Sequence, residues 1–218
     1  ESVLHALPTT GHPMDWLSVG IHALGMIETT NDWRSDAMNL IARMPRLMGL
    51  VFRIREGRTE NIPADDPDAS LVDRFVNTID LDGIDKEKMT RVISTYLVLH
   101  MDHGGGNLST FTGKAIASGH ATIYSAMAGA MNALSGPLHG RANQSCLEFV
   151  LRVGTSDAAK VEAFVRAELA AKRPVFGFGH AVLRTEDPRA TAQFALGEEI
   201  CPEDENFKII KTLREVAP

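Results

Sequence analysis

The sequence predicts an all-α protein, on two observations. Apolar residues recur at helical spacing in almost every segment of the 218-residue chain. No segment shows a convincing alternation of apolar and polar residues, which is the pattern of a half-buried β-strand. A hydrophobic fraction of 44% is ordinary for a globular protein with a core, so we expect helices packed on helices.

The first predicted helices follow from their apolar spacing and from the residues that can begin them. Pro13 can occupy a first helical position, and apolar residues follow it at helical spacing. Asn31 can cap a second helix, which Pro45 interrupts or kinks and which residues 46–55 can continue. Residues 56–69 contain two prolines and several acidic residues, so we expect them to form an exposed loop.

The remaining segments also begin with capping residues. Ser70 and Asp85 can cap the next two helices, Asn107 or Ser109 the one after them, and Ser156 a later one. The helix after Asp85 has the clearest apolar face, formed by Met89, Val92, Ile93, Tyr96, Leu97 and His100. Further helices are predicted at 108–119, 121–135, 142–153, 157–171, 188–199 and 203–216.

Two of these helices, 108–119 and 121–135, are rich in small residues. Small side chains let helix backbones approach closely, which suits a buried helix pair or a subunit interface. The character of the sequence then changes near 136–140, from long apolar helices to shorter and more charged ones. This change indicates a domain boundary or hinge, where binding sites are often found.

Composition and charge argue against several classes of function. The formal net charge of −6 disfavours nucleic acid or an anionic membrane as the main partner. No apolar run reaches the roughly 18 residues that span a membrane. Two cysteines are too few for a disulfide framework and fit a reducing compartment. We expect a bacterial cytoplasm, with the mitochondrial matrix as the alternative. Both chain ends are expected to be cuts in a longer protein.

Candidate chemistry is concentrated in two loops that contain glycines. The segment 177–189 places His180, Arg184 and Arg189 near a small-residue turn. Arginine binds carboxylates through planar two-point hydrogen bonds, so this segment suits small, multiply charged carboxylates; a surface loop with incidental charges is the alternative. The second loop presents His139 between glycines. A neutral histidine there can donate a hydrogen bond to a developing oxyanion, or it can have a structural role.

A third candidate, His103, directly precedes three glycines and lies three residues after His100. A catalytic metal site usually needs a third protein ligand, and none follows at a recognisable spacing, so no metal is expected. The amide groups of the glycine turn suit an anion, which gives His103 a binding role. A core or capping role remains open.

Four motifs together resemble the citrate synthase family. They are GFGHAVLRTEDPR at 177–189, GPLHGRANQ at 136–144, DHGGGN at 102–107 and HPM at 12–14. They occur in the family's order, and the resemblance is closest to its mitochondrial-type branch. It implies an all-α fold with residues 1–139 in a large domain and 140–218 in most of a small one. It also implies a homodimer formed through the helices at 108–119 and 121–135.

The resemblance further implies the condensation of acetyl-CoA with oxaloacetate to give citrate and CoA. No tightly bound cofactor is implied, because CoA acts as a co-substrate. His139 would then hydrogen-bond the thioester oxygen, and His180 would polarise the oxaloacetate carbonyl. His103 and Arg189 would hold the carboxylates of oxaloacetate. The CoA-binding residues implied are Val175, Phe176, Gly177, Phe178, Gly179 and Arg184.

One group that the resemblance implies is not in this sequence. The chain ends before the position of the aspartate that serves the family as general base. We therefore expect little or no condensation activity from this chain alone. Three alternatives remain: a 2-methylcitrate synthase acting on propionyl-CoA, a citryl-CoA lyase module, and a non-catalytic module that binds ligands or assembles with a partner.

Overall fold

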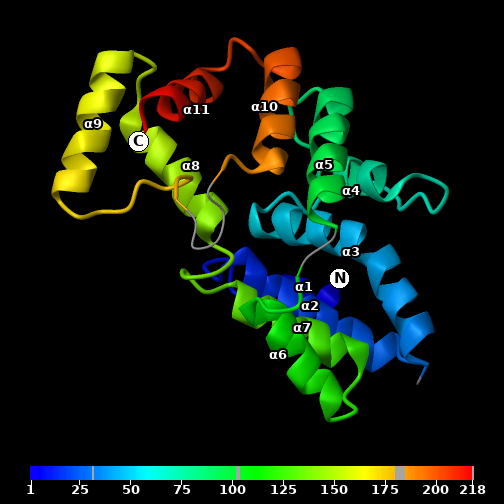
Figure 1. Ribbon diagram of the computed structural model, residues 1–218. Coiled ribbons are helices and arrows are strands. Elements are labelled where there is room, and N and C mark those ends of the chain that lie inside the picture. Colours follow the sequence, from blue (N-terminus) through cyan, green and yellow to red (C-terminus); the bar gives the residue numbers. More distant parts are fainter. Residues whose placement is uncertain (31, 102–103, 180–184, 218) are drawn as a thin grey trace. The chain divides into compact units, whose positions relative to one another are not determined.

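The computed structural model describes residues 1–30, 32–101, 104–179 and 185–217. Within these residues every regular element is an α-helix and there is no β-strand, so the all-α prediction is confirmed (Figure 1). The chain divides into two compact units, Glu1–His139 and Gly140–Pro218. Their assignment to the large and small domains of a longer protein stays a prediction.

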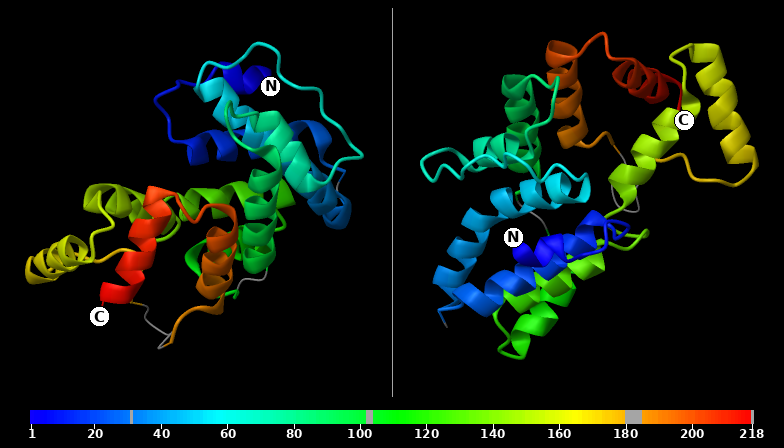
Figure 2. Two further views of the ribbon diagram at one scale, coloured as in Figure 1. Left: turned by 90° about the horizontal axis from the view of Figure 1, so that it is seen from above. Right: turned by 180° about the vertical axis from the view of Figure 1, so that it is seen from behind.

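The first unit is built around the α2, α3 and α7 helices. Its helices are α1 (Ser2–His5), α2 (Pro13–Glu28), α3 (Trp33–Arg55), α4 (Leu71–Ile79), α5 (Lys86–His100), α6 (Leu108–Ser118) and α7 (Ile123–Leu134). Helix α7 packs against both α2 and α6, and α3 packs against α2 and α4 (Figure 2). The buried core where these helices meet includes Trp16, Leu17, Ile21, Leu47, Leu50, Val51, Tyr124 and Ala128.

Small residues lie where the helices of the first unit cross. Gly25 of α2 lies against Tyr124 of α7, and Gly113 of α6 faces Ala126 and Ala130 of α7. Because small side chains let helix backbones approach closely, this packing by itself accounts for the composition of α6 and α7. The subunit interface expected at these two helices therefore stays a prediction.

Helix starts are capped largely as expected, with two corrections. Three of the predicted caps are confirmed by their side-chain hydrogen bonds, at Ser70, Asp85 and Asn107. Helix α3 is capped by Asp32, whose carboxylate accepts a backbone N–H at 3.0 Å, and Asn31 lies outside the described residues. Helix α9 (Ala158–Ala170) is capped by Asp157 rather than Ser156, again through a carboxylate that accepts a backbone N–H at 3.0 Å. In each case the helix begins one residue later than its apolar spacing indicates.

Pro45 does not interrupt α3, which runs without a break from Trp33 to Arg55. Residues 46–55 continue it, as expected. A proline inside a helix removes one hydrogen bond and crowds the preceding turn. Leu40 on one side of Pro45 and Leu50 on the other are both buried in the core, and this packing holds the helix together across the proline.

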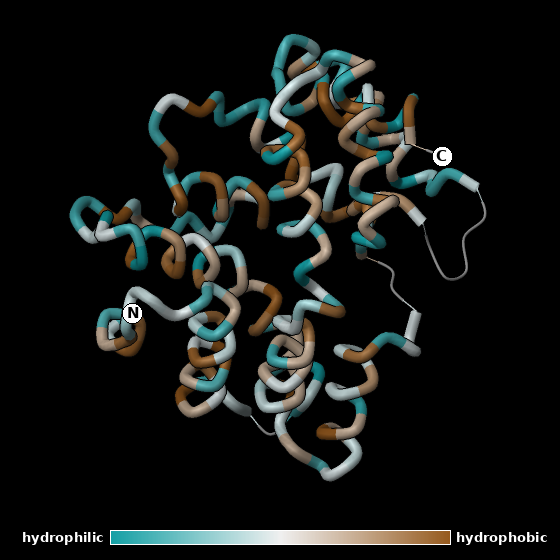
Figure 3. Tube along the Cα trace, turned by 90° about the vertical axis from the view of Figure 1, so that its left-hand side faces the viewer, coloured by the Kyte–Doolittle hydropathy of each residue, from teal (hydrophilic) through white to brown (hydrophobic). Residues whose placement is uncertain are grey.

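The apolar face predicted for α5 is not buried in the described structure. No residue of α5 is classed as buried, and Val92 and Leu97 are 43% and 48% exposed. Figure 3 shows hydrophobic and hydrophilic residues alternating in turn along the helices. Periodicity therefore predicted the helix correctly, but it did not predict what would cover its apolar face.

The second unit has its own core. Its helices are α8 (Ala142–Val153), α9, α10 (Pro188–Ile200) and α11 (Glu205–Val216). Three of them, α8, α9 and α11, meet around buried apolar side chains: Phe149, Val150, Val153, Val161, Val165, Ile209 and Leu213. No helix in the described part of the chain combines the length and apolar character needed to cross a membrane.

Candidate functional site

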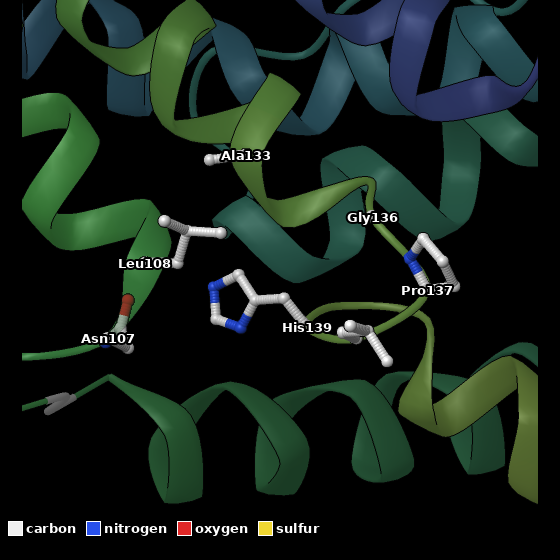
Figure 4. Close-up of a pocket in the computed structure, with 7 residues that line it drawn as sticks. Asn107, Leu108, Ala133, Gly136, Pro137 and His139 are labelled. Carbon is white, nitrogen blue, oxygen red and sulfur yellow. The ribbon is translucent and has the colours of Figure 1, made fainter.

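His139 lies on the turn that follows α7, and its side chain reaches the start of α6. The turn is closed by the backbone N–H of His139, which donates to the carbonyl of Gly136 at 3.1 Å. At the start of α6, the backbone N–H of Ser109 donates to His139 Nε2 at 3.2 Å, and Ser109 Oγ lies 2.9 Å from the same nitrogen. Two segments thirty positions apart are thus joined at one imidazole (Figure 4).

The contact with Ser109 assigns the tautomer of His139. A backbone N–H can only donate, so Nε2 must present a lone pair to it. In a neutral imidazole the hydrogen then sits on Nδ1. His139 is consequently arranged as a hydrogen-bond donor through Nδ1, with Nε2 occupied by the first turn of α6.

Asn107 ties this helix start to the glycine turn before it. Its Oδ1 accepts from the backbone N–H of Thr110 at 2.9 Å and from the hydroxyl of Ser109 at 2.7 Å. Its Nδ2 donates to the carbonyl of Gly104 at 2.8 Å. The cap therefore fixes Ser109, and Ser109 in turn orients His139. The sequence identified Asn107 as a cap, but nothing in it indicated that Ser109 would contact His139.

An open pocket of about 500 Å³ lies at this point. That volume is within the range typical of small-molecule sites. Its lining is mostly apolar and includes the imidazole, as Figure 4 shows, and its residues are Asn107, Leu108, Ala133, Gly136, Pro137, Leu138 and His139. All of them belong to the first unit, so this unit alone forms a concave site with one polar group positioned to donate.

In the second unit, residues 175–179 form a loop anchored at its start. Val175 and Phe176 pack against the core of the second unit. The backbone N–H of Phe178 donates to the carbonyl of Val175 at 3.3 Å, which closes a turn. Gly177 and Gly179 have φ angles of 90° and 77°, in the region that favours glycine.

The underside of this loop lies close to a cysteine of α8. A Cβ placed on Gly177 would lie 3.2 Å from the Sγ of Cys146, so a larger residue would displace the loop even in a permitted conformation. Cys146 is half-buried, and burial raises the pKa of its thiol. The thiol therefore acts here as a packing group under the loop.

Arg189 lies in the first turn of α10, as predicted, and has an acidic partner. Its guanidinium donates to both carboxylate oxygens of Asp187, with Nε at 3.0 and 3.1 Å and Nη2 at 2.5 Å. Asp187 also caps α10 by accepting the backbone N–H of Arg189 at 2.9 Å. This pairing explains how a cation is tolerated at a helix N-terminus, where the dipole disfavours it.

Three of the predicted site residues, His103, His180 and Arg184, lie outside the described residues. The described ones form two separate groups, His139 in the first unit and Arg189 with residues 175–179 in the second. Among described residues, no group of three or more histidine, cysteine, aspartate or glutamate side chains is arranged to hold a metal ion.

Comparison with known proteins identifies the family. A family model described as the citrate synthase C-terminal domain matches residues 1–218. The mitochondrial 2-methylcitrate synthase of Yarrowia lipolytica is 34% identical over 100% of this chain and 50% of its own length. The mitochondrial citrate synthase of Saccharomyces cerevisiae is 32% identical over 99% of this chain and 48% of its own length. The chain thus spans about half the length of the curated relatives it matches.

Solved structures agree with these sequence matches. The citrate synthase of Thermotoga maritima superposes with a TM-score of 0.82 at 31% identity, covering 98% of this chain and 56% of that one. A citrate synthase from Thermoplasma acidophilum, described as a ternary complex with carboxymethyl coenzyme A and oxaloacetate, gives a TM-score of 0.83 at 26% identity, covering 98% and 57%. This chain belongs to the citrate synthase family.

Proposed function

We propose that the chain is part of an enzyme that condenses acetyl-CoA with oxaloacetate and releases citrate and CoA. The observation that carries this proposal is His139, which accepts a backbone N–H at Nε2 and so presents Nδ1–H beside an open pocket. The relatives named citrate synthase support the same reaction. No metal or tightly bound cofactor is required, because CoA enters and leaves as a co-substrate.

In this proposal His139 stabilises the enol or enolate of acetyl-CoA. When a proton leaves the acetyl methyl group, negative charge develops on the thioester oxygen. A donor that is already oriented toward that oxygen stabilises the charge without reorganisation, which is commonly the largest single contribution to catalysis. The bond from Ser109 keeps Nε2 as an acceptor, so the hydrogen stays on Nδ1.

The other predicted residues complete the site by resemblance. His180 polarises the ketone carbonyl of oxaloacetate, and His103 and Arg189 bind its carboxylates. Arg189 supports this role because it already forms a two-point pair with a carboxylate, that of Asp187. On the CoA side, Arg184 meets phosphates and residues 175–179 line the adenine pocket, where two glycines with positive φ leave the backbone accessible.

Substitution of His139 tests the proposal. The assay follows CoA thiol release from acetyl-CoA and oxaloacetate, both with this chain and with a longer protein that contains it. His139→Gln should lower turnover by about 100-fold or more, the usual effect of removing one such donor. The control is His22→Gln, because His22 is exposed on α2. Turnover by the His139 variant equal to that of the control contradicts the proposed role.

A second candidate activity is the condensation of propionyl-CoA. It is favoured by the relative named 2-methylcitrate synthase, at 34% identity. The ratio of kcat/KM for acetyl-CoA and propionyl-CoA distinguishes the two activities. Product analysis from citryl-CoA tests a lyase. Calorimetric titration with oxaloacetate and CoA identifies a non-catalytic module, which would bind without turnover.

We also propose a homodimer formed through α6 and α7. Leu108 and Phe111 of α6 are 55% and 65% exposed, which supports a further contact on that helix. Sedimentation equilibrium with Phe111→Glu tests it: the variant should be monomeric if the proposal holds. For the compartment, the relatives named mitochondrial support the mitochondrial matrix, and a bacterial cytoplasm stays a prediction.

A further inference from the structure

A buried carboxylate, Glu168, lies at the end of α9 between two arginines. Its side chain is only 6% exposed. It accepts hydrogen bonds from Arg173 through Nε at 3.1 Å and Nη2 at 2.7 Å, and from Arg152 through Nη2 at 2.9 Å. The hydrogen bond from Arg173 lowers the pKa of Glu168 most and outweighs its burial, so the group is a charged acceptor.

Glu168 also holds Arg173 through the main chain. The backbone N–H of Arg173 donates to the carbonyl of Glu168 at 2.9 Å, and Lys172 between them has a φ angle of 55°. This left-handed residue ends α9 and reverses the chain. One residue of α9 therefore fixes both the backbone and the guanidinium of Arg173, and so sets the direction in which the chain leaves the helix.

The 175–179 loop begins two positions after Arg173, and the second arginine supports it from below. The guanidinium of Arg152 lies over the rings of Phe149 and Phe164, at 5.5 and 5.7 Å from their centroids. Phe149 in turn makes an edge contact with Phe176 of the loop, with centroids 6.2 Å apart. Glu168 is thus linked to the loop by two routes, along the chain and through the aromatic core.

We propose that Glu168 is a positioning residue that holds the 175–179 loop, through Arg173, in the geometry that accepts CoA. This inference rests on the proposed role of the loop in CoA binding. Glu168 does not itself contact CoA in this proposal. It acts by orienting the segment in which Gly177 and Gly179 leave the backbone accessible.

The test combines a measurement on the loop with a measurement on the ligand, both on the 218-residue chain. Glu168→Gln keeps the shape of the side chain and removes its charge, and Arg173→Gln removes the partner. Backbone amide exchange should accelerate about ten-fold at 174–179 in both variants, the size expected for losing hydrogen bonds to a charged group. The matched control is Glu162→Gln, because Glu162 pairs with Arg166 on the same helix through an exposed ion pair.

The binding measurement is calorimetric titration with CoA. Glu168→Gln should weaken CoA binding about ten-fold, while Glu162→Gln should leave it unchanged. If the unaltered chain binds no CoA, the proposed function of the loop fails, and the exchange result still decides whether Glu168 positions it. Unchanged exchange at 174–179 in Glu168→Gln overturns the inference. An equal acceleration in α8 and α9 also overturns it, because Glu168 would then stabilise the unit in general.

Discussion

The close crossing of α2 and α7 makes Gly25→Ala a sharp test of the packing in the first unit. A Cβ at Gly25 would lie 2.6 Å from the Cβ and 2.9 Å from the Cγ of Tyr124. Tyr124 is 1% exposed and these atoms are next to its backbone, so they cannot move aside. The substitution must therefore push α7 away from α2, and α7 leads directly into the turn that carries His139.

Two opposing effects set the size of the change. Alanine favours helix over glycine by about 1 kcal/mol in a helix interior. An added methyl group that forces backbones apart costs about 1–3 kcal/mol, and contacts as short as these place the cost in the upper half of that range. Gly25→Ala should therefore destabilise the first unit by about 1–2 kcal/mol. Gly113→Ala is the matched control, because its Cβ would lie 3.4 Å from its nearest neighbours on α7, so only the helix-favouring effect remains.

Urea unfolding followed by tryptophan fluorescence measures both changes. The two tryptophans, Trp16 and Trp33, lie in the first unit, so the signal reports on that unit. With a slope of about 2 kcal/mol/M, the midpoint of Gly25→Ala should fall by about 0.5–1 M. The midpoint of Gly113→Ala should stay or rise. A Gly25→Ala variant at least as stable as the unaltered chain, with the same slope, would refute the packing argument.

Two further predictions concern a buried carboxyl and the cysteines. Burial raises the pKa of Asp36, but hydrogen bonds from the N–H and hydroxyl of Thr30 and the hydroxyl of Thr29 outweigh it and lower that pKa. The resulting stability is present above the ordinary value of 3.8 and is lost as the pH falls through the lowered pKa, so Asp36→Asn should reduce the urea midpoint at pH 7 and approach the unaltered chain below about pH 4. In the second prediction, iodoacetamide should modify exposed Cys201 before half-buried Cys146, whose thiol pKa is raised; peptide mass mapping over time checks the order, and equal rates would contradict the burial of Cys146.

Most of the fold followed from local features of the sequence. Helix spacing and the caps at Ser70, Asp85 and Asn107 depend on residues within a few positions of one another, so they could be predicted without the tertiary structure. The errors were also local, since Asp32 and Asp157 cap helices one residue after the predicted positions. The motifs identified the family because they are contiguous.

The tertiary structure decided which distant groups meet. Ser109 contacts His139 only because α6 and α7 pack side by side, and that packing depends on helix crossings that no local pattern encodes. The charge of Glu168 looked like one of many helix-surface acids until the fold buried it between Arg152 and Arg173. By itself, the sequence therefore determined the helices, their caps and the loops that carry the candidate chemistry. Only the packing of those helices determined the tautomer of His139 and the support of the 175–179 loop, because both depend on contacts between residues far apart in the chain or on the burial of a charge.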